Sequence, residues 1–158
     1  MDPDISVEEL VTKFKPNTKL VFGETIANPS LKVLDIEKFA KVEHEHGVPL
    51  IVDNTFPTPV FCRSFEWGVD IVVHSTTKYM DGSANAVGGA VVDSGNFDWE
   101  KYGDKFKSLT TPDETYHRVV YTKTFGKAAY ITKMTTNLMR DLGAIPSPQN
   151  SFYLGIGL

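Results

Sequence analysis

Short apolar runs alternate with helical patterns along the first part of the chain. Residues 18–24, 48–54, 70–75 and 86–93 are rich in Val, Ile and Leu and are bounded by glycine or polar residues, which predicts β-strands. The second run contains LIVD and shows no alternation of apolar and polar positions. Continuous apolar runs are typical of strands that are buried on both faces of a parallel sheet.

Helical spacing separates these runs and follows the last one. Residues 35–46 form a predicted amphipathic helix, and Gly47 follows at a position where helices commonly end. Other helices are predicted at 7–14, at 60–67 before Gly68, and after Ser94, most clearly at 115–142 with a break near Gly126. Strands that alternate with helices predict an α/β fold with a mostly parallel sheet, flanking helices and right-handed crossovers.

Composition places the chain among globular proteins. It has 158 residues, of which 41% are hydrophobic and 23% charged, enough for one domain with a core. The net charge of -4 and the lack of a basic stripe argue against nucleic acid as a partner. The chain has a single cysteine, which fits a reducing compartment, and its N-terminus is acidic and lacks the apolar segment of a signal peptide. No apolar run is long enough to span a membrane. We therefore expect a cytoplasmic protein with no membrane partner. The uncharged sequence SFYLGIGL at 151–158 predicts a further element, so we expect a partial chain.

Polar side chains follow three of the predicted strands. Asn28 follows the first, Asp53 closes the second, and Ser75, Thr77 and Lys78 follow the third. Ligands of open α/β sheets bind beyond the carboxyl ends of the strands, so these side chains are expected to share one rim. A lysine can hold pyridoxal phosphate as a Schiff base, and an aspartate can pair with its protonated ring nitrogen. Each residue alone has an ordinary structural explanation, and the joint pattern favours a pyridoxal phosphate site.

The sequence DIVVHSTTKYMDG, residues 70–82, resembles the lysine signature of the pyridoxal-phosphate enzymes of cysteine and methionine metabolism. GETIANPSLKVLDI and VPLIVDNTFPTPVFCRSFEWG resemble the same family in the same order. The second of these and VVDSGNFDW are more similar to its O-acetylhomoserine sulfhydrylase (homocysteine synthase) branch than to cystathionine lyases. The resemblance implies the large cofactor domain of a fold-type I, aspartate aminotransferase-like enzyme. Residues 1–158 match only the middle of that domain, without its N-terminal cofactor segment or the C-terminal domain. Ser83 departs from the histidine that the family often has there.

The resemblance also implies roles for single residues. Lys78 matches the catalytic lysine that holds the cofactor and moves protons, and Asp53 matches the partner of the ring nitrogen. The other matching positions are Ser75 and Thr77 at the phosphate, Asn28 near the ring hydroxyl, and Thr55 and Glu24 in supporting places.

The implied reaction is a γ-substitution in methionine biosynthesis. Sulfide or a thiol would replace the acetate of O-acetylhomoserine and give homocysteine or a related thioether. The family implies a homotetramer with sites shared between subunits, and we expect the partial chain alone to be inactive. Three alternatives stay open: a methionine or cystathionine γ-lyase, a cystathionine γ-synthase, and a non-catalytic fragment.

Four other motifs favour ordinary structural roles. Ser75 and Lys78 also fit the Ser-x-x-Lys motif of penicillin-binding enzymes, but that motif requires a helix start and partner motifs that the chain lacks. His44 and His46 would not share a helix face, so a metal site is not expected. Cys62 has no basic neighbour in sequence and predicts a packed thiol. The sequence GIGL lacks the strand–turn–helix context of a nucleotide site.

Overall fold

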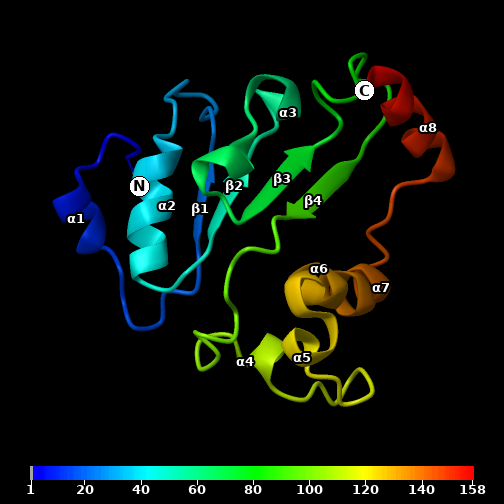
Figure 1. The fold of residues 1–158 in the computed structure, drawn as a ribbon. Coiled ribbons are helices and arrows are strands. Elements are labelled where there is room, and N and C mark those ends of the chain that lie inside the picture. Colours follow the sequence, from blue (N-terminus) through cyan, green and yellow to red (C-terminus); the bar gives the residue numbers. More distant parts are fainter. Residues whose placement is uncertain (1) are drawn as a thin grey trace. The chain divides into compact units, whose positions relative to one another are not determined.

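The computed structural model describes residues 2–158 and contains a four-stranded sheet in the order β1-β2-β3-β4. The strands are β1 (Val21–Glu24), β2 (Leu50–Asp53), β3 (Ile71–Ser75) and β4 (Gly89–Asp93). β1 pairs with β2 and β2 with β3 in parallel, whereas the arrows of β3 and β4 point in opposite directions in Figure 1. The prediction of an α/β fold with a mostly parallel sheet is confirmed.

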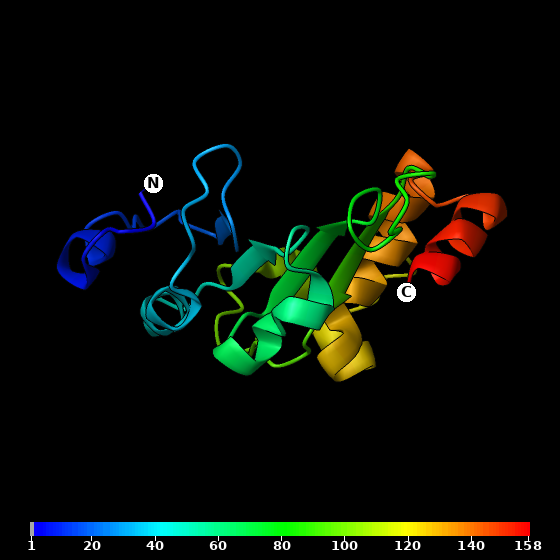
Figure 2. The same ribbon diagram turned by 90° about the horizontal axis from the view of Figure 1, so that it is seen from above.

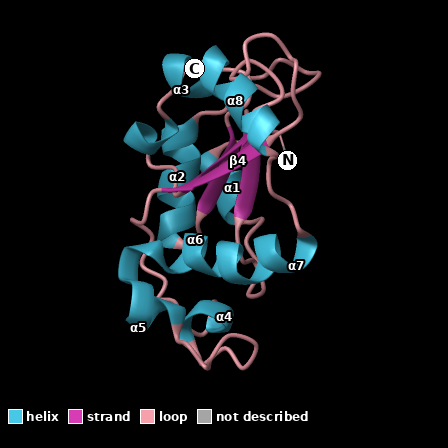
Figure 3. Ribbon diagram, turned by 90° about the vertical axis from the view of Figure 1, so that its right-hand side faces the viewer, coloured by secondary structure: helices cyan, strands magenta, loops and turns pink. Residues whose placement is uncertain are grey.

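The chain divides into two compact units, which we describe separately. The first contains the residues up to Val92 together with Pro146–Leu158, and the second contains Asp93–Ile145. The first unit carries the four-stranded sheet, shown in magenta in Figure 3, except for Asp93 at the end of β4. Its helical elements are α1 (Val7–Val11), α2 (Ile36–Glu45), α3 (Thr58–Phe61), the 3-10 helix η1 (Ser64–Trp67) and α8 (Pro148–Gly157).

α2 packs its apolar face into the main core of the first unit. The side chain of Asp35 caps the helix by accepting a hydrogen bond from Lys38 N, and the helix ends before Gly47, whose φ of 63° is left-handed. β2 is buried along Leu50, Ile51 and Val52, as the unbroken apolar run predicts. The core cluster consists of Ile5, Leu10, Leu34, Ile36, Phe39, Ala40, Val42, Leu50, Val52, Val69 and Val72.

Residues 60–67 do not form one helix. The prediction of a single short helix is wrong, because Cys62 is extended and separates α3 from η1. The predicted stop at Gly68 is confirmed, since this glycine is left-handed with a φ of 93°. A Cβ at Gly68 would also lie 3.0 Å from the Cβ of Ala40 on α2, so the turn needs glycine for two reasons.

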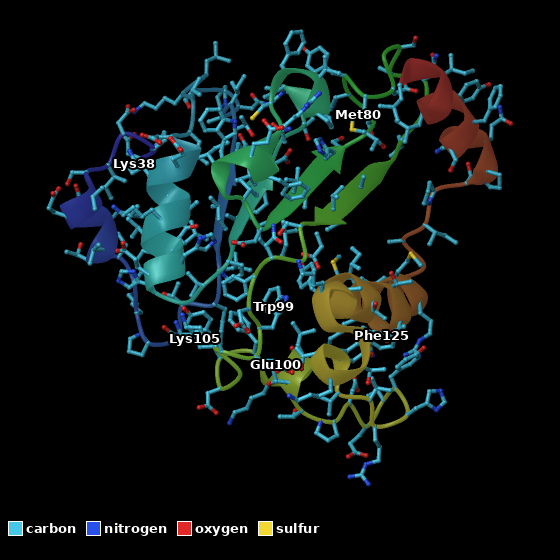
Figure 4. The ribbon with its side chains drawn as sticks, viewed as in Figure 1. Lys38, Met80, Trp99, Glu100, Lys105 and Phe125 are labelled. Carbon is cyan, nitrogen blue, oxygen red and sulfur yellow. The ribbon has the colours of Figure 1, made fainter. Side chains whose placement is uncertain are left out.

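The second unit is helical and has an aromatic core. Its elements are α4 (Lys107–Thr110), α5 (Tyr121–Phe125), η2 (Gly126–Ala128), α6 (Ala129–Lys133), the π-helical η3 (Met134–Met139) and α7 (Arg140–Leu142). The ring of Trp99, labelled in Figure 4, stacks on Tyr130 with 5.4 Å between centroids, and Phe106 meets Trp99 edge-on at 4.9 Å. Such ring pairs stabilise a core beyond the burial of their area.

The predicted helix start at Thr115 is wrong, because residues before Tyr121 form a closed loop. Asp113 N donates to Val119 O at 2.9 Å, and Asp113 Oδ1 accepts from both the backbone and the hydroxyl of Thr115. The other carboxylate oxygen binds Lys133 Nζ at 2.6 Å, and this bond lowers the pKa of Asp113. These bonds compete successfully with the helix. The predicted break at Gly126 is confirmed by its φ of 54°.

α8 is a helix that the sequence pattern does not predict. Ser147 Oγ accepts a hydrogen bond from Asn150 N and caps it, and Pro148 occupies the first turn. Both residues are typical of a helix start. The uncharged residues 151–158 therefore continue a helix that begins before them.

Candidate functional site

The carboxyl ends of three parallel strands meet at one edge of the sheet. In the register of the sheet, Glu24 lies opposite Asp53, and Asp53 lies opposite Val73, two positions before Ser75. A cavity of about 180 Å³ opens at this edge. It is lined by Glu24, Ile26, Asn28, Asp53, Thr55, Phe56, Ser75 and Lys78. The structure thus brings Lys78, Asp53, Ser75, Asn28 and Thr55 together, as well as Glu24.

The carboxylate of Asp53 is held through one of its two oxygens. Oδ1 accepts hydrogen bonds from Thr55 N at 2.9 Å and from the Thr55 hydroxyl, which makes a very short contact. Within residues 2–158 the side chain makes no other hydrogen bond, so Oδ2 is available to a donor in the cavity. A carboxylate fixed in this way can face a cationic group without further ordering.

The hydroxyl of Thr55 connects two strands. Its oxygen accepts from Ser75 N at 2.8 Å, while its only hydrogen is directed to Asp53 Oδ1. A hydroxyl has one donor hydrogen, so this group has no proton left for a ligand. Thr55 therefore orients Asp53 relative to the end of β3, which is a supporting position of the kind expected for it.

Asn28 and Glu24 lie together on the opposite side of the rim. Asn28 N donates to Glu24 Oε2 at 2.8 Å, and both residues line the cavity. This bond uses the backbone of Asn28 and leaves its side-chain amide for other partners. The amide can donate to an oxygen atom within the cavity.

Lys78 is exposed and lies in a turn rather than in a helix. Lys78 N donates to Ser75 O at 3.2 Å, and residues 76–81 continue as a turn. Thr77 is the one predicted site residue that does not line the cavity. Its hydroxyl oxygen accepts from Gly88 N at 3.1 Å and donates to Gly88 O at 3.2 Å. In this structure the Thr77 side chain closes the loop between β3 and β4.

Asn54 is a buried residue next to the cavity that holds the surrounding loop in place, and the sequence pattern does not identify it as a site residue. It is 1% exposed, and its amide nitrogen donates to Thr58 O at 3.2 Å and Cys62 O at 2.8 Å. Its amide oxygen accepts from the Thr25 hydroxyl at 2.9 Å. These bonds hold the loop that carries Phe56, a lining residue that the sequence also does not indicate. The only signal in the sequence is the position of Asn54 and Phe56 beside Asp53 and Thr55.

The other motifs take structural roles. His44 Nε2 lies 2.8 Å from Asp70 Oδ2, which raises the pKa of His44, and His46 stacks on Phe14 with 4.2 Å between ring centroids. Cys62 packs against the main core. No helix begins at Ser75, so the Ser-x-x-Lys motif lacks its required context.

Residues 2–158 contain no group of three or more His, Cys, Asp or Glu side chains placed to hold a metal ion. Within the same range, none of the helices has both the length and the apolar character that a membrane crossing requires.

Comparison with known families decides how this rim is interpreted. The sequence model of the family described as "Cys/Met metabolism PLP-dependent enzyme" matches residues 1–158, which is the full length of the chain. The chain belongs to this family. Members of the Cys/Met metabolism family are pyridoxal-phosphate-dependent enzymes, and the resemblance seen in the lysine signature is confirmed.

Curated relatives are more than one third identical to this chain over the aligned residues. The homocysteine/cysteine synthase of Saccharomyces cerevisiae is 44% identical over 148 residues, which are 93% of this chain and 33% of the relative. The O-acetyl-L-homoserine sulfhydrylase of Corynebacterium glutamicum is 44% identical over 141 residues, 87% of this chain and 32% of the relative. The chain thus spans about a third of the length of the curated relatives that it matches.

Solved structures of family members have the same fold. A protein from Campylobacter jejuni that contains N'-pyridoxyl-lysine-5'-monophosphate has a TM-score of 0.89 at 34% identity, over 99% of this chain and 38% of that chain. The O-acetylhomoserine sulfhydrylase of Wolinella succinogenes has a TM-score of 0.81 at 33% identity, over 99% of this chain and 41% of that chain. The cystathionine gamma-lyase of Lactobacillus plantarum has a TM-score of 0.69 at 28% identity, over 99% and 32%.

The residues at the rim fit the family's cofactor. The cavity contains an amine that can bind an aldehyde, a carboxylate with one oxygen available, a hydroxyl and an amide. A carboxylate suits a protonated ring nitrogen, and an amide donor suits a phenolic oxygen. All of these groups line one cavity.

Proposed function

We propose that residues 1–158 form part of the pyridoxal-phosphate-binding domain of an O-acetylhomoserine sulfhydrylase. The relatives with that name, or named homocysteine synthase, support this substrate class. The observation that carries the proposal is the cavity at the ends of β1, β2 and β3, which Lys78 and Asp53 line together. The full-length enzyme would act on small molecules, assemble as a homo-oligomer and work in the cytoplasm.

Each residue of the rim has a chemical task in this proposal. When bound, pyridoxal phosphate supplies an electron-accepting ring that stabilises negative charge at the substrate's α-carbon. Lys78 Nζ would hold the cofactor, take the proton from the substrate's α-carbon once it is free, and return a proton later. Asp53 Oδ2 would keep the ring nitrogen protonated, and the Asn28 amide would donate to the ring hydroxyl. Ser75 would donate to the phosphate.

Thr77 fits its expected phosphate contact less directly than Ser75. Its hydroxyl hydrogen is bonded to Gly88 O, so a phosphate contact would require the side chain to exchange partners. We infer that Ser75 provides the main hydroxyl contact from this chain, and that Thr77 fixes the loop that follows β3.

A sulfhydrylase is favoured over a γ-lyase by similarity. The sulfhydrylase of Wolinella succinogenes is more similar in structure than the lyase of Lactobacillus plantarum, with TM-scores of 0.81 and 0.69. In the sulfhydrylase reaction the four-carbon substrate exchanges its γ-substituent for sulfur and keeps its amino group. In the lyase reaction it loses both the γ-substituent and the amino group, and a four-carbon keto acid and ammonia are released. That difference makes the choice testable.

Product analysis of the full-length protein that carries this chain tests the proposal. With O-acetylhomoserine and sulfide, homocysteine and acetate are expected in equal amounts. Lys78→Ala is expected to lower the rate by at least about 100-fold, because proton transfer at the substrate's α-carbon loses its base. Release of a keto acid and ammonia regardless of sulfide would instead indicate a lyase, and a Lys78→Ala rate equal to that of the wild type would refute the assignment.

Thr55 provides a test of how Asp53 is oriented. Thr55→Val removes the hydroxyl that donates to Asp53 and leaves Ser75 N without its acceptor, so we expect cofactor affinity to fall about tenfold, or roughly 1–2 kcal/mol. Thr55→Ser keeps the hydroxyl and is expected to restore most of the affinity. Equilibrium titration with pyridoxal phosphate measures both. Equal affinities of the Val and Ser variants would show that the hydroxyl does not matter.

A further inference from the structure

The loop between β3 and β4 carries Lys78 and contains neither helix nor strand. Near its start, Asp81 N donates to Thr76 O at 3.1 Å and closes a turn around Lys78. At its end, Gly88 lies so close to Thr76 that a Cβ there would be 2.5 Å from Thr76 Oγ1. These contacts tie the turn to the strands but leave residues 82–87 without regular structure.

α8 contacts this loop at two separate places, although it lies far from the loop in the sequence. Figures 1 and 2 both show α8 beside the loop, and Figure 4 labels Met80 on it. Near the helix start, Asn150 Nδ2 donates to Val87 O at 2.8 Å. At the helix end, Gly157 packs directly on the backbone of Met80 and Asp81.

The contact at Gly157 leaves no room for a side chain. A Cβ there would lie 2.6 Å from Met80 O and still closer to Asp81 O, both backbone atoms, so the loop would have to move. Gly82 completes the contact from the other side, because its own Cβ position is 3.5 Å from Gly157 Cα and its φ is 73°. Gly155 on the same helix has nothing within 4 Å of its Cβ position.

Helix propensity alone does not explain a glycine at position 157. Glycine inside a helix is less favourable than alanine, because its backbone loses more conformational freedom on folding. At Gly155 no contact requires the absence of a side chain, whereas at Gly157 the missing side chain lets the helix pack against the backbone of Met80 and Asp81. The contact therefore fixes the position of Asp81, whose backbone N–H closes the turn around Lys78.

We propose that α8 is a positioning element for Lys78, and that Gly157 is its positioning residue. The helix supports the Lys78 turn through the backbone contact at Asp81 and anchors the other end of the loop through Asn150. This inference rests on the proposed role of Lys78 as the residue that holds the cofactor.

Two alanine substitutions on the same helix form a matched pair. Gly157→Ala and Gly155→Ala make the same chemical change on the same helix, but only the first meets the loop. In the full-length protein, we measure the rate of borohydride-trapped labelling of Lys78 by pyridoxal phosphate and the pH midpoint of the bound cofactor's visible absorbance. Misplacement of a reacting group by about 1 Å can cost on the order of 100-fold in rate, so Gly157→Ala should slow labelling by about 10- to 100-fold and shift the midpoint. Gly155→Ala should match the wild type.

The outcomes separate this inference from the proposed function. If the wild type is not labelled at Lys78, the proposed function fails. If the wild type is labelled and both alanine variants behave like it, the positioning role of α8 fails. If Gly157→Ala lowers only the melting temperature and leaves rate and midpoint unchanged, the contact serves stability alone and the inference also fails.

A second pair at the other end of α8 keeps the test decisive if Gly157→Ala does not fold. Asn150→Ala removes the bond to Val87 O, and Gln149→Ala changes the exposed neighbour in the same helical turn. Asn150→Ala is expected to slow labelling of Lys78 about threefold, because the loop loses one hydrogen bond to the helix while the contact at Gly157 remains. Equal labelling rates in the two variants would overturn the inference.

Discussion

Asp53→Asn is expected to lower kcat/KM of the full-length enzyme by about 100- to 1000-fold. A neighbouring opposite charge shifts a pKa by about 1–3 units, and each unit corresponds to about tenfold in rate or equilibrium. The amide oxygen of the introduced asparagine would still accept both hydrogen bonds from Thr55, so the local geometry is retained. The substitution thus removes the charge that the cavity offers to the ring nitrogen and changes little else.

The control for this variant is Asp104→Asn, which makes the same change on an exposed residue of the second unit. It is expected to retain wild-type kcat/KM. Steady-state kinetics with O-acetylhomoserine and sulfide measures both variants. An Asp53→Asn enzyme with activity within a few-fold of Asp104→Asn would contradict the assignment of Asp53.

Replacement of Glu43 by glutamine is expected to stabilise the chain strongly at neutral and alkaline pH. The side chain is completely buried, and within residues 2–158 neither of its carboxylate oxygens has a hydrogen-bond partner. Burial, and to a smaller extent the carboxylate of Asp70, raises the pKa of Glu43 to about 9 from an ordinary value of 4.5. The group is therefore protonated in the folded chain at pH 7 and ionised in the unfolded chain.

The sign of the pH dependence follows from this difference. The contribution of Glu43 to stability is complete below pH 4.5, and it is lost progressively as the pH rises toward about 9. Glutamine does not titrate, so Glu43→Gln should match the wild type near pH 4.5 and exceed it by about 2–4 kcal/mol at pH 8. Urea unfolding across this pH range measures the difference. Glu37→Gln, on the exposed side of the same helix, should keep the wild-type pH dependence, and a parallel profile for Glu43→Gln would refute the explanation.

The sheet and its rim could be predicted because local patterns determine them. Unbroken apolar runs place β2 and β3, and the polar residues after them have to lie at the same edge once the strands are parallel. The predicted bounds are less accurate, since β1 begins at Val21 and β4 at Gly89, later than the apolar patterns. Strand ends depend on pairing with neighbours, which a single run does not encode.

The wrong predictions fall where side chains bond to the backbone. Asp113 closes a loop with Thr115 and Val119 and delays the helix to Tyr121, although the spacing of apolar residues after Thr115 is helical. The sequence does not predict α8 because its polar and apolar residues do not follow the spacing of an amphipathic helix. Its start is indicated only by Ser147 and Pro148. Thr77 does not line the cavity, because its hydroxyl bonds to Gly88, and the sequence does not show this contact; its phosphate contact stays a prediction.

Long-range contacts at the site are also invisible in the sequence. Asn54, Phe56 and Gly157 matter because of residues that they meet only after folding. Gly157 in particular belongs to GIGL, which carries no recognisable motif, and its role becomes clear only from its closeness to Asp81 O.

The most direct test of the account is the location of the cofactor bond. The full-length protein is incubated with pyridoxal phosphate, reduced with borohydride, digested and analysed by peptide mass spectrometry. The account predicts a single reduced adduct on the peptide that contains Lys78, and its loss in Lys78→Ala. An adduct on a different lysine, or labelling spread over exposed lysines with none favoured, would contradict the claim that the ends of β1, β2 and β3 form the cofactor site.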